Sequence, residues 1–366
     1  MSSPVILSLP EGCKVKFIAE GAANLVFELD LSEIVDTSSQ EFFQGKLLRV
    51  AKTGTKAYLH QELHAYWETV VQPLFDGGDL VQQWLVRLRT NGTDQGRDDD
   101  DIISRLNAAL HANETLRRED FQGSKVVDAE YGMLVEDMRK RDEDDVVLEF
   151  KPKWLAQSPN APPSAKRCRN CAREAHRMNT KKRKKGAPIL CALDLVHCRT
   201  DPRALEHVIP HLTSSGSGLV ENGPANNSSI INWLVTNTLL ERLRDVQVGN
   251  DSTGPLSIPD AKADGESTQA QNENRKRQLE QLQLAMTLRD CTCFLRVRSR
   301  SNGVHVEAKL ADLDKKNWHA KLSYWQKMER TLQDEGYYAA TEEPRQITTC
   351  RLEREASHCT VGMSER

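Results

Sequence analysis

The stretch LEFKPKW, residues 148–154, ends an apolar segment with one carboxylate and two ammonium groups placed around a proline. Pro152 fixes its own φ and favours an extended conformation at Lys151. In an extended chain Lys151 and Lys153 project from the same face, together with Glu149. Two cations on one face repel each other unless an anion lies between them. The stretch therefore predicts either a site for a phosphate-rich ligand or a solvated strand edge that lysines protect from aggregation.

Composition limits the class of protein. The chain has 366 residues, enough for two lobes or domains, and a formal net charge of −3, so any anion site must be local rather than general. Its nine cysteines do not suggest a disulfide scaffold. We recognise no signal peptide, no apolar run of about 18 residues and no prenylation box. We expect a soluble monomer, nuclear or cytoplasmic, with no membrane partner.

Hydrophobic periodicity predicts a β-rich first part and a more irregular, helix-rich second part. In the first part we expect strands at 14–29 (a hairpin), 46–52 and 130–138, a helix near 57–72 and an acidic loop at 91–101. In the second part we expect helices near 203–212, 230–247 and 274–288, strands at 291–297 and 304–313 joined by an Asn-Gly turn, and a helix from Trp318. Disordered loops are expected at 178–188, 213–228 and 249–275. The prediction is an α+β fold with domains 1–139 and 140–366.

Two segments of the first domain suit a nucleotide. The small-residue turn EGAAN, residues 20–24, lets backbone N–H groups approach phosphate oxygens, and Arg49 and Lys52 on the next strand could reach the same phosphates. An ordinary hairpin turn is the alternative. The strand ending in Glu136 and Asp137 is similar to a hinge whose backbone pairs with an adenine edge, whereas propensity alone indicates an interior strand.

Strand-terminal carboxylates mark the second domain. Asp290 precedes one strand of the C-terminal hairpin, and Asp312 and Asp314 end the other. Carboxylate oxygens are the hard ligands that magnesium prefers. Cations and a tyrosine follow closely: Lys315, Lys316, Lys321 and Tyr324. Metal-binding carboxylates beside phosphate-binding cations form the pattern that phosphoryl transfer requires, while a solvated turn whose aspartates cap the next helix is the alternative.

Cysteines and basic residues lie between these segments. Cys168 and Cys171 form a C-x-x-C motif with His176, Cys191, His197 and Cys198 nearby, which indicates either a zinc site or reduced, unligated cysteines. The lysine-rich run 181–185 indicates a nuclear-import tag, with a solvated loop or a nucleic-acid patch as alternatives. Arg169, Arg173 and Arg177 would share one helix face, so with Arg167 they are secondary candidates for phosphate contacts.

The segments GAANLVFEL, LLRVAK, MLVEDM, LEFKPKWL, CALDLV, LRDCTCFL and KLADLDKKN occur in this order, and through them the chain resembles the inositol-pentakisphosphate 2-kinases, in a fungal version, over about residues 15–340. The resemblance implies a two-lobed inositol phosphate kinase fold. Its protein-kinase-like, β-rich N-lobe would bind ATP, and its larger mixed α/β C-lobe would bind the inositol ring. The implied reaction, with Mg²⁺, transfers the γ-phosphate of ATP to the axial 2-hydroxyl of inositol 1,3,4,5,6-pentakisphosphate and gives phytate.

The resemblance also implies roles for single residues. It assigns contacts with the nucleotide to Gly21, Ala22, Asn24, Arg49, Val135, Glu136, Asp137 and Glu149. It assigns contacts with the substrate phosphates to Lys151, Lys153, Lys316, Lys321 and Tyr324, with Arg173 and Arg177 as secondary candidates. Asp290 would engage the 2-hydroxyl, Lys151 would stabilise the transferred phosphoryl group, and Asp312 with Asp290 would hold magnesium.

Two other classes of protein compete with a kinase. A non-catalytic inositol-phosphate-binding scaffold would need the same cations, but it would bind anions better without Asp290 and Asp312. A nucleic-acid-binding protein would use the run 181–185, yet the balanced net charge and the lack of aromatic residues within that run disfavour it.

Overall fold

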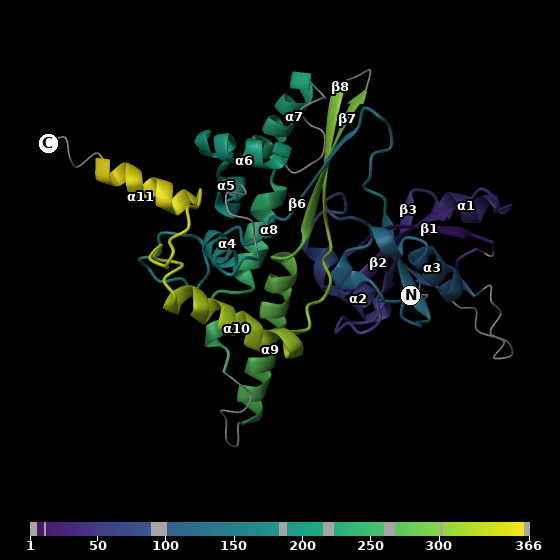
Figure 1. Cartoon of the computed structure of the whole chain (residues 1–366), viewed down its shortest axis with the longest axis horizontal. Helices are drawn as coiled ribbons and strands as arrows, with labels where there is room; N and C mark the ends of the chain where they lie inside the picture. Colours follow the sequence, from purple (N-terminus) through teal and green to yellow (C-terminus); the bar gives the residue numbers. More distant parts are fainter. Residues whose placement is uncertain are drawn as a thin grey trace. The chain divides into compact units, whose positions relative to one another are not determined.

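The computed structural model describes residues 6–10, 12–88, 101–182, 189–214, 223–259, 268–300 and 303–361. These residues form a mixed α+β structure with two β-sheets, which confirms the α+β part of the expected fold class. It divides into two compact units, unit 1 (residues 1–138) and unit 2 (residues 139–366) (Figure 1). In the part of the chain that is described, no helix combines the length and the apolar character needed to cross a membrane.

Unit 1 contains an antiparallel sheet of five strands in the order β1-β2-β3-β5-β4. The strands are β1 (Lys14–Glu20), β2 (Asn24–Asp30), β3 (Lys46–Ala51), β4 (Gln83–Arg87) and β5 (Tyr131–Glu136). The helices are α1 (Thr37–Phe43), α2 (His60–Tyr66), the π-helical turn η1 (Trp67–Val71), α3 (Ile102–His111) and the 3₁₀ turns η2 (Gln72–Leu74), η3 (Glu114–Leu116) and η4 (Glu119–Phe121). The predicted strands and the predicted helix are confirmed, whereas β4, α1 and α3 were not predicted. The acidic loop lies largely outside the described residues.

The core of unit 1 follows from two periodicities. Leu25, Phe27 and Leu29 alternate along β2 and are buried, as expected of a strand with one covered face. Leu106 and Leu110 lie one helical turn apart on α3 and pack in the same cluster. The helix α3 therefore covers the sheet with its apolar face.

Unit 2 contains a three-stranded antiparallel sheet, β6-β7-β8, and most of the helices. Its strands are β6 (Val146–Phe150), β7 (Thr292–Arg300) and β8 (Gly303–Ala311). Its helices are α4 (Arg169–Asn179), α5 (Ala192–His197), α6 (Arg203–Ser214), α7 (Gly223–Thr236), α8 (Leu239–Gly249), the 3₁₀ turn η6 (Pro255–Ser257), α9 (Gln269–Leu288), α10 (Trp318–Asp334) and α11 (Arg351–Val361). The long helix α9 runs directly into β7 (Figure 1), so residues 289–291 link the helical part of unit 2 to its sheet.

The sequence predicted too much disorder. Met178 and Asn179 belong to α4, residues 223–228 belong to α7, and α9 begins at Gln269 behind a capping box made by Thr268 and Gln271. Only parts of the three expected loops, residues 183–188, 215–222 and 260–267, lie outside the described residues. The predicted helix at 230–247 is two helices, α7 and α8, with a break at Asn237 and Thr238.

Residues 250–259 are ordered by contacts that composition does not reveal. The carboxylate of Asp251 lies 2.5 Å from the guanidinium of Arg289 and accepts a hydrogen bond from the backbone N–H of Gly254 at 2.8 Å. Arg289 also stacks on the ring of Trp154, and Ile258 fills an apolar cluster with the same tryptophan. Because these groups are buried, the loop is fixed to the core of unit 2.

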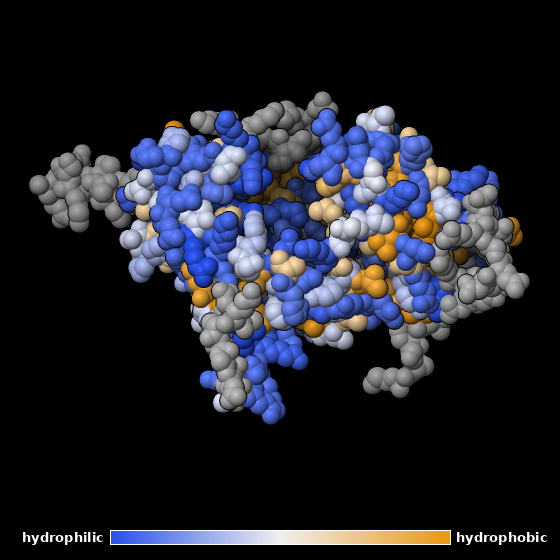
Figure 2. Space-filling view, turned by 60° about the horizontal axis from the view of Figure 1, so that its bottom comes forward, coloured by the Kyte–Doolittle hydropathy of each residue, from blue (hydrophilic) through white to orange (hydrophobic). Residues whose placement is uncertain are grey.

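Hydrophilic residues cover most of the face seen in Figure 2.

The Asp251–Arg289 pair gives a stability prediction. Asp251→Ala leaves a buried guanidinium without its carboxylate, so the variant should lose about 3 kcal/mol of unfolding free energy. Ser252→Ala, at an exposed neighbour, is the control and should unfold like the wild type. Chemical denaturation followed by circular dichroism measures both, and equal midpoints for the two variants would contradict the structural role of the pair.

Candidate functional site

The segment after β6 turns sharply instead of staying extended. The strand ends at Phe150, and Lys153 has a left-handed backbone with φ 60°. The expectation that Glu149, Lys151 and Lys153 lie on one face of an extended strand is therefore wrong. A left-handed conformation at a non-glycine residue is unfavourable and persists only where surrounding contacts impose it, often at functional sites.

Lys151 and Lys153 nevertheless lie close together, because both contact Asp290. Lys153 Nζ lies 3.1 Å from Asp290 Oδ1, and Lys316 Nζ lies 2.9 Å from Asp290 Oδ2. Lys151 Nζ donates to the backbone carbonyl oxygen of Asp290 at 2.9 Å. Each carboxylate oxygen of Asp290 thus has its own ammonium partner, and a third ammonium lies beside the same residue.

Asp312 completes this group. Its carboxylate Oδ2 lies 3.1 Å from Lys151 Nζ, and its backbone is also left-handed, with φ 57°. The aspartates do not cap the next helix, because the N-cap of α10 is Asn317, whose side chain accepts from the backbone N–H of Ala320. We call the five residues Lys151, Lys153, Asp290, Asp312 and Lys316 the lysine–aspartate cluster.

The electrostatics of the cluster favour a bound anion. Burial alone would raise the pKa of Asp290, but the charges of Lys316 and Lys153 outweigh it and hold that pKa well below the ordinary value. Burial lowers the pKa of Lys153 in spite of Asp290, whereas the two aspartates of the cluster overcome burial at Lys316 and raise its pKa. Three ammoniums face two carboxylates, so the cluster carries an excess of positive charge.

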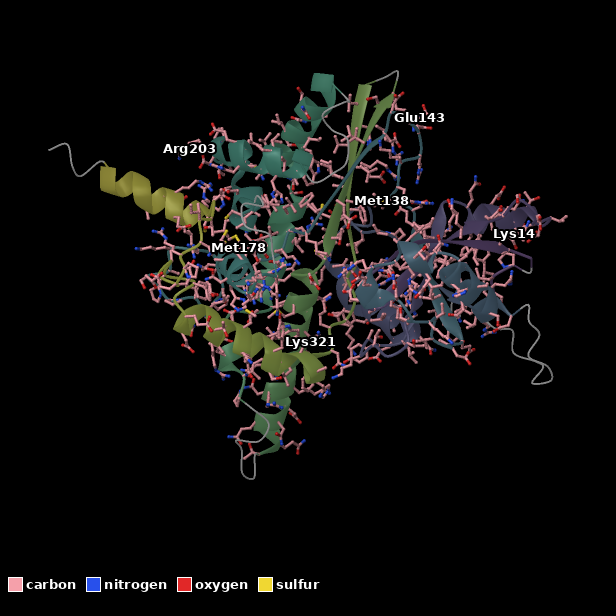
Figure 3. All side chains as sticks on the ribbon, in the orientation of Figure 1. Lys14, Met138, Glu143, Met178, Arg203 and Lys321 are labelled. Atoms are coloured by element: carbon pink, nitrogen blue, oxygen red, sulfur yellow. The ribbon has the colours of Figure 1, made fainter. Side chains whose placement is uncertain are left out.

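Arg173 and Tyr324 form a second contact in unit 2. The Arg173 guanidinium donates to the Tyr324 hydroxyl at 2.9 Å. Arg173 also lies close enough to lower the pKa of Lys153, although burial is the larger cause. Lys321, near the start of α10 (Figure 3), has its ammonium 6.0 Å from the ring centroid of Tyr324. These three predicted residues therefore lie together.

The other arginines of this region have carboxylate partners. Arg167 is fully buried against Glu342 at 2.8 Å, and Arg169 is buried against Glu329 at 2.7 Å, so the expectation that these two contact phosphate is wrong. Arg177 pairs with Glu174 at 2.9 Å on the same helix. Its role in substrate binding stays a prediction.

The predicted phosphate loop of unit 1 is a tight turn between β1 and β2. The backbone N–H of Gly21 donates to the carbonyl oxygen of Asn24 at 2.9 Å, and a side chain at Gly21 would meet no atom within 4 Å. Ala22 lies in this turn, Asn24 opens β2, and Arg49 is buried within β3. Lys52 is buried at 2.5 Å from Glu20, so it serves the core of unit 1.

The predicted adenine hinge includes the end of β5, the strand between β3 and β4, and continues into Asp137. Val135 pairs with both β3 and β4. The backbone N–H of Glu136 donates to Gln82 at 3.0 Å, and that of Asp137 donates to Gly45 at 3.0 Å. Because these two N–H groups already have hydrogen-bond acceptors, an adenine would have to contact other groups of this segment. Glu149 is an exposed residue of β6, in unit 2.

Four cysteines converge in unit 2. Sγ atoms of Cys168, Cys171, Cys191 and Cys350 all lie within 4.8 Å of one another, and all four residues are buried. Hydrogen bonding from Cys168 and the other thiols, together with burial, raises the pKa of Cys171, whereas the contacts with Cys168, Cys171 and Cys191 lower the pKa of Cys350. We call these residues the four-cysteine cluster.

The sequence identified three members of the four-cysteine cluster and missed Cys350, because a distance of 159 residues from Cys191 gives no local signal. His176, His197 and Cys198 are not in the cluster. His176 packs against the ring of Tyr337, His197 contacts the carbonyl oxygen of Leu193, and Cys198 donates to Asp194. Residues 183–185 of the lysine-rich run lie outside the described residues.

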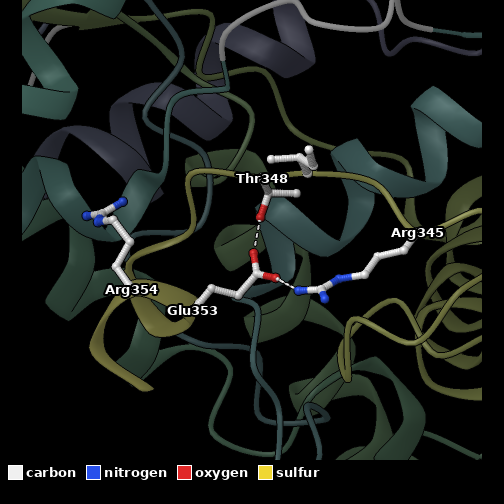
Figure 4. Close-up of a pocket in the computed structure, with 5 residues that line it drawn as sticks. Arg345, Thr348, Glu353 and Arg354 are labelled. Atoms are coloured by element: carbon white, nitrogen blue, oxygen red, sulfur yellow. Dashed lines mark hydrogen bonds and ion pairs between the residues drawn. The ribbon is translucent and has the colours of Figure 1, made fainter. Parts of the chain in front are cut away.

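A shallow pocket near α11 is lined by different residues (Figure 4). Glu353 occupies its centre, where it accepts from Thr348 Oγ1 at 2.5 Å and pairs with Arg345 at 3.2 Å. Glu353 also lies 3.4 Å from the buried Arg167. These internal partners make the pocket part of the packing of α11 and leave the lysine–aspartate cluster as the better candidate site.

Comparison with known proteins gives a consistent result. The family model described as inositol-pentakisphosphate 2-kinase matches residues 17–331. A curated protein of Yarrowia lipolytica named inositol-pentakisphosphate 2-kinase is 29% identical over 193 residues, which cover 52% of this chain and 53% of the relative. The match thus spans about half the length of that relative. The range of the family model includes the whole lysine–aspartate cluster but ends before Cys350.

The electrostatics predict how stability depends on pH. Because the pKa of Asp290 lies below its ordinary 3.8, ionised Asp290 stabilises the folded protein above that pH, and this contribution is lost as the pH falls through the folded-state pKa. The melting temperature of the wild type should exceed that of Asp290→Asn by a constant amount at about pH 5–7, and the difference should shrink below about pH 4. Asp334→Asn, at an exposed position, is the control. A difference that persists undiminished at about pH 2 would show that the lysines do not hold the Asp290 charge.

Proposed function

The chain belongs to the inositol-pentakisphosphate 2-kinase family, and from this premise we propose that it transfers the γ-phosphate of ATP to the 2-hydroxyl of inositol 1,3,4,5,6-pentakisphosphate, giving phytate. The observation that carries the proposal is the contact of both Asp290 carboxylate oxygens with lysines, next to a second aspartate. A carboxylate surrounded by phosphate-binding cations can orient a hydroxyl between phosphate groups.

The substrate supplies the charge that the cluster lacks. Five phosphates carry roughly eight or more negative charges at neutral pH. Lys151, Lys153 and Lys316 would exchange their present carboxylate partners for phosphate oxygens. Arg173, Lys321 and Tyr324 would extend the same cationic surface, and Arg177 is a further candidate. Charge-assisted hydrogen bonds of this kind are roughly twice as strong as neutral ones.

Substrate binding also prepares Asp290 as a base. In the present structure the charges of Lys316 and Lys153 outweigh burial and hold its pKa below the ordinary value, which makes Asp290 a weaker base. Phosphates that draw Lys153 and Lys316 away, and add negative charge nearby, raise the pKa of Asp290. Asp290 would then accept the proton of the 2-hydroxyl as the oxygen attacks the γ-phosphorus and ADP leaves. Lys151, next to both aspartates, would stabilise the charge on the transferred phosphoryl group.

The cofactors follow from the same residues. The carboxylates of Asp312 and Asp290 are hard oxygen donors that suit Mg²⁺, and the ion would neutralise charge on the nucleotide phosphates. In unit 1 we assign the nucleotide to the turn with Gly21, Ala22 and Asn24, to Arg49, and to the segment with Val135, Glu136 and Asp137. Glu149 is a further nucleotide candidate in unit 2.

Activity assays test the reaction. Lys151→Ala, Asp290→Ala and Asp312→Ala should each abolish phytate formation from ATP, Mg²⁺ and inositol pentakisphosphate, because each removes a charge that acts on the reacting groups. Asp334→Ala is the matched control and should keep wild-type turnover. Circular dichroism checks that the variants fold.

Three outcomes would contradict the assignment in different ways. Near-wild-type turnover by Asp290→Ala would remove that residue from the mechanism. Thermal stabilisation of the wild type by inositol pentakisphosphate without release of ADP would favour the non-catalytic scaffold. Salt-sensitive RNA binding with neither response would favour a nucleic-acid-binding protein.

The four-cysteine cluster fits zinc. A tetrahedral site with Zn–S bonds of about 2.3 Å places sulfurs about 3.8 Å apart, and Cys168 Sγ lies 3.9 Å from Cys191 Sγ. Cys168 and Cys191 are the N-caps of α4 and α5, and Cys350 directly precedes α11. Thiolates are favoured at helix N-termini. We therefore assign a structural zinc that ties the segment before α11 to the start of α4, the helix that carries Arg173.

The zinc assignment predicts one metal ion per chain in elemental analysis of the purified protein. Cys350→Ser should lower the zinc content and the melting temperature, because it removes one ligand of four. Cys198→Ser, which changes a buried cysteine outside the cluster, should keep the metal. A wild-type protein that binds no zinc after refolding with the ion present would refute the assignment.

A further inference from the structure

Two buried glutamines hold the lysines that bind Asp290. Gln247 on α8 donates from Nε2 to the backbone carbonyl oxygen of Lys153 at 2.9 Å. Gln283 on α9 donates from Nε2 to the backbone carbonyl oxygen of Lys316. The residues are 1% and 3% exposed, so neither amide is available to substrate. Each of the two lysines that contact the Asp290 carboxylate therefore accepts, at its own backbone carbonyl oxygen, a hydrogen bond from a buried glutamine.

We propose that Gln247 and Gln283 are positioning residues of the lysine–aspartate cluster, which fix Lys153 and Lys316 at the two carboxylate oxygens of Asp290. The inference rests on the proposed function, since it assigns these lysines to the substrate phosphates. It extends the site to two helices, α8 and α9, whose side chains do not themselves reach the reacting atoms.

Gln247 joins two of the three chain segments that form the cluster. Besides Lys153, its amide nitrogen donates to the carbonyl oxygen of Leu288 at 3.2 Å, two residues before Asp290. Its Oε1 accepts from the backbone N–H of Leu155 at 3.1 Å. A side chain here must therefore both donate and accept. These bonds help to impose the left-handed backbone of Lys153, which is otherwise unfavourable.

Gln283 acts with Thr287, one helical turn further along α9. The Thr287 hydroxyl donates to the carbonyl oxygen of Asp314 at 3.1 Å, and Gln283 reaches Lys316 two residues later. Together they attach the chain between β8 and α10 to α9. Because Asp290 follows the end of α9, the same helix sets the positions of both Asp290 and its partner Lys316.

Gln326 provides a matched comparison within unit 2. It is 2% exposed, lies on α10, and donates from Nε2 to the carbonyl oxygens of Pro255 at 3.2 Å and Ile258 at 2.8 Å. Its burial and hydrogen bonding resemble those of Gln247, but its partners lie in and beside η6, outside the lysine–aspartate cluster. Any loss of substrate affinity that follows merely from removing a buried amide should therefore appear equally in Gln326 variants.

The test compares Gln247→Met, Gln283→Met and Gln326→Met in the full chain. Methionine keeps the length of the side chain and removes its hydrogen bonds. Calorimetry should show about tenfold weaker binding of inositol pentakisphosphate by the first two variants, because misplaced binding groups lose affinity, and wild-type affinity for Gln326→Met. All three should lose melting temperature to a similar extent.

Double variants separate positioning from general destabilisation. In the Lys153→Ala background, Gln247→Met should cause no further loss of affinity, whereas Gln283→Met should still cause its full loss. The reverse should hold in the Lys316→Ala background. If a methionine variant does not fold, the corresponding leucine variant, which is also uncharged and also lacks the hydrogen bonds, takes its place with the same expectations.

The outcomes distinguish this inference from the proposed function. Wild-type protein that neither binds nor turns over inositol pentakisphosphate would refute the proposed function and the positioning role together, whereas binding without turnover would refute the proposed function alone. Active wild-type protein with equal affinities in all three methionine variants would overturn the positioning role alone. Losses of binding free energy that add fully in every double variant would also overturn the positioning role, because they would show that the glutamines do not act through the lysines.

Discussion

The pairing of one carboxylate with two ammoniums is the constraint on which the site in unit 2 depends. Asp290 lies between Lys153 and Lys316, and Lys151 contacts both its backbone and Asp312. Without ligand, two aspartates keep three lysines together at short range. The arrangement has an excess of positive charge, so a polyanion can take the place of the carboxylates as the partner of these lysines.

Partner groups, rather than residue type, decide what each cation does. Arg167 and Arg169 resemble Arg173 in the sequence, but Glu342 and Glu329 neutralise the first two inside unit 2. Arg173 instead donates to a tyrosine hydroxyl and leaves its charge available. Sequence spacing could group these arginines on a helix, but only the fold shows which of them have a carboxylate.

The sequence predicted much of the fold and most of the residues that the structure brings together in the lysine–aspartate cluster. Alternating apolar residues identified β1, β2, β3, β5 and the terminal hairpin, and strand-end charges identified Lys151, Asp290 and Asp312. Contacts between distant segments could not be predicted. The ion pair of Asp251 with Arg289 orders a loop that composition alone predicted to be disordered. Cys350 lies beside three cysteines that are far away in the sequence. Lys153 has a left-handed backbone in a setting of hydrogen bonds from distant segments. Local patterns carry no information about such partners, and they misled where composition indicated disorder.

The most direct test of the account is a crystal structure of the protein with inositol pentakisphosphate and a non-hydrolysable ATP analogue. We predict that the 2-hydroxyl lies within hydrogen-bond distance of Asp290, and that Lys153 and Lys316 have moved from its carboxylate to substrate phosphates. A substrate bound elsewhere, with both lysines still paired to Asp290, would contradict the central claim.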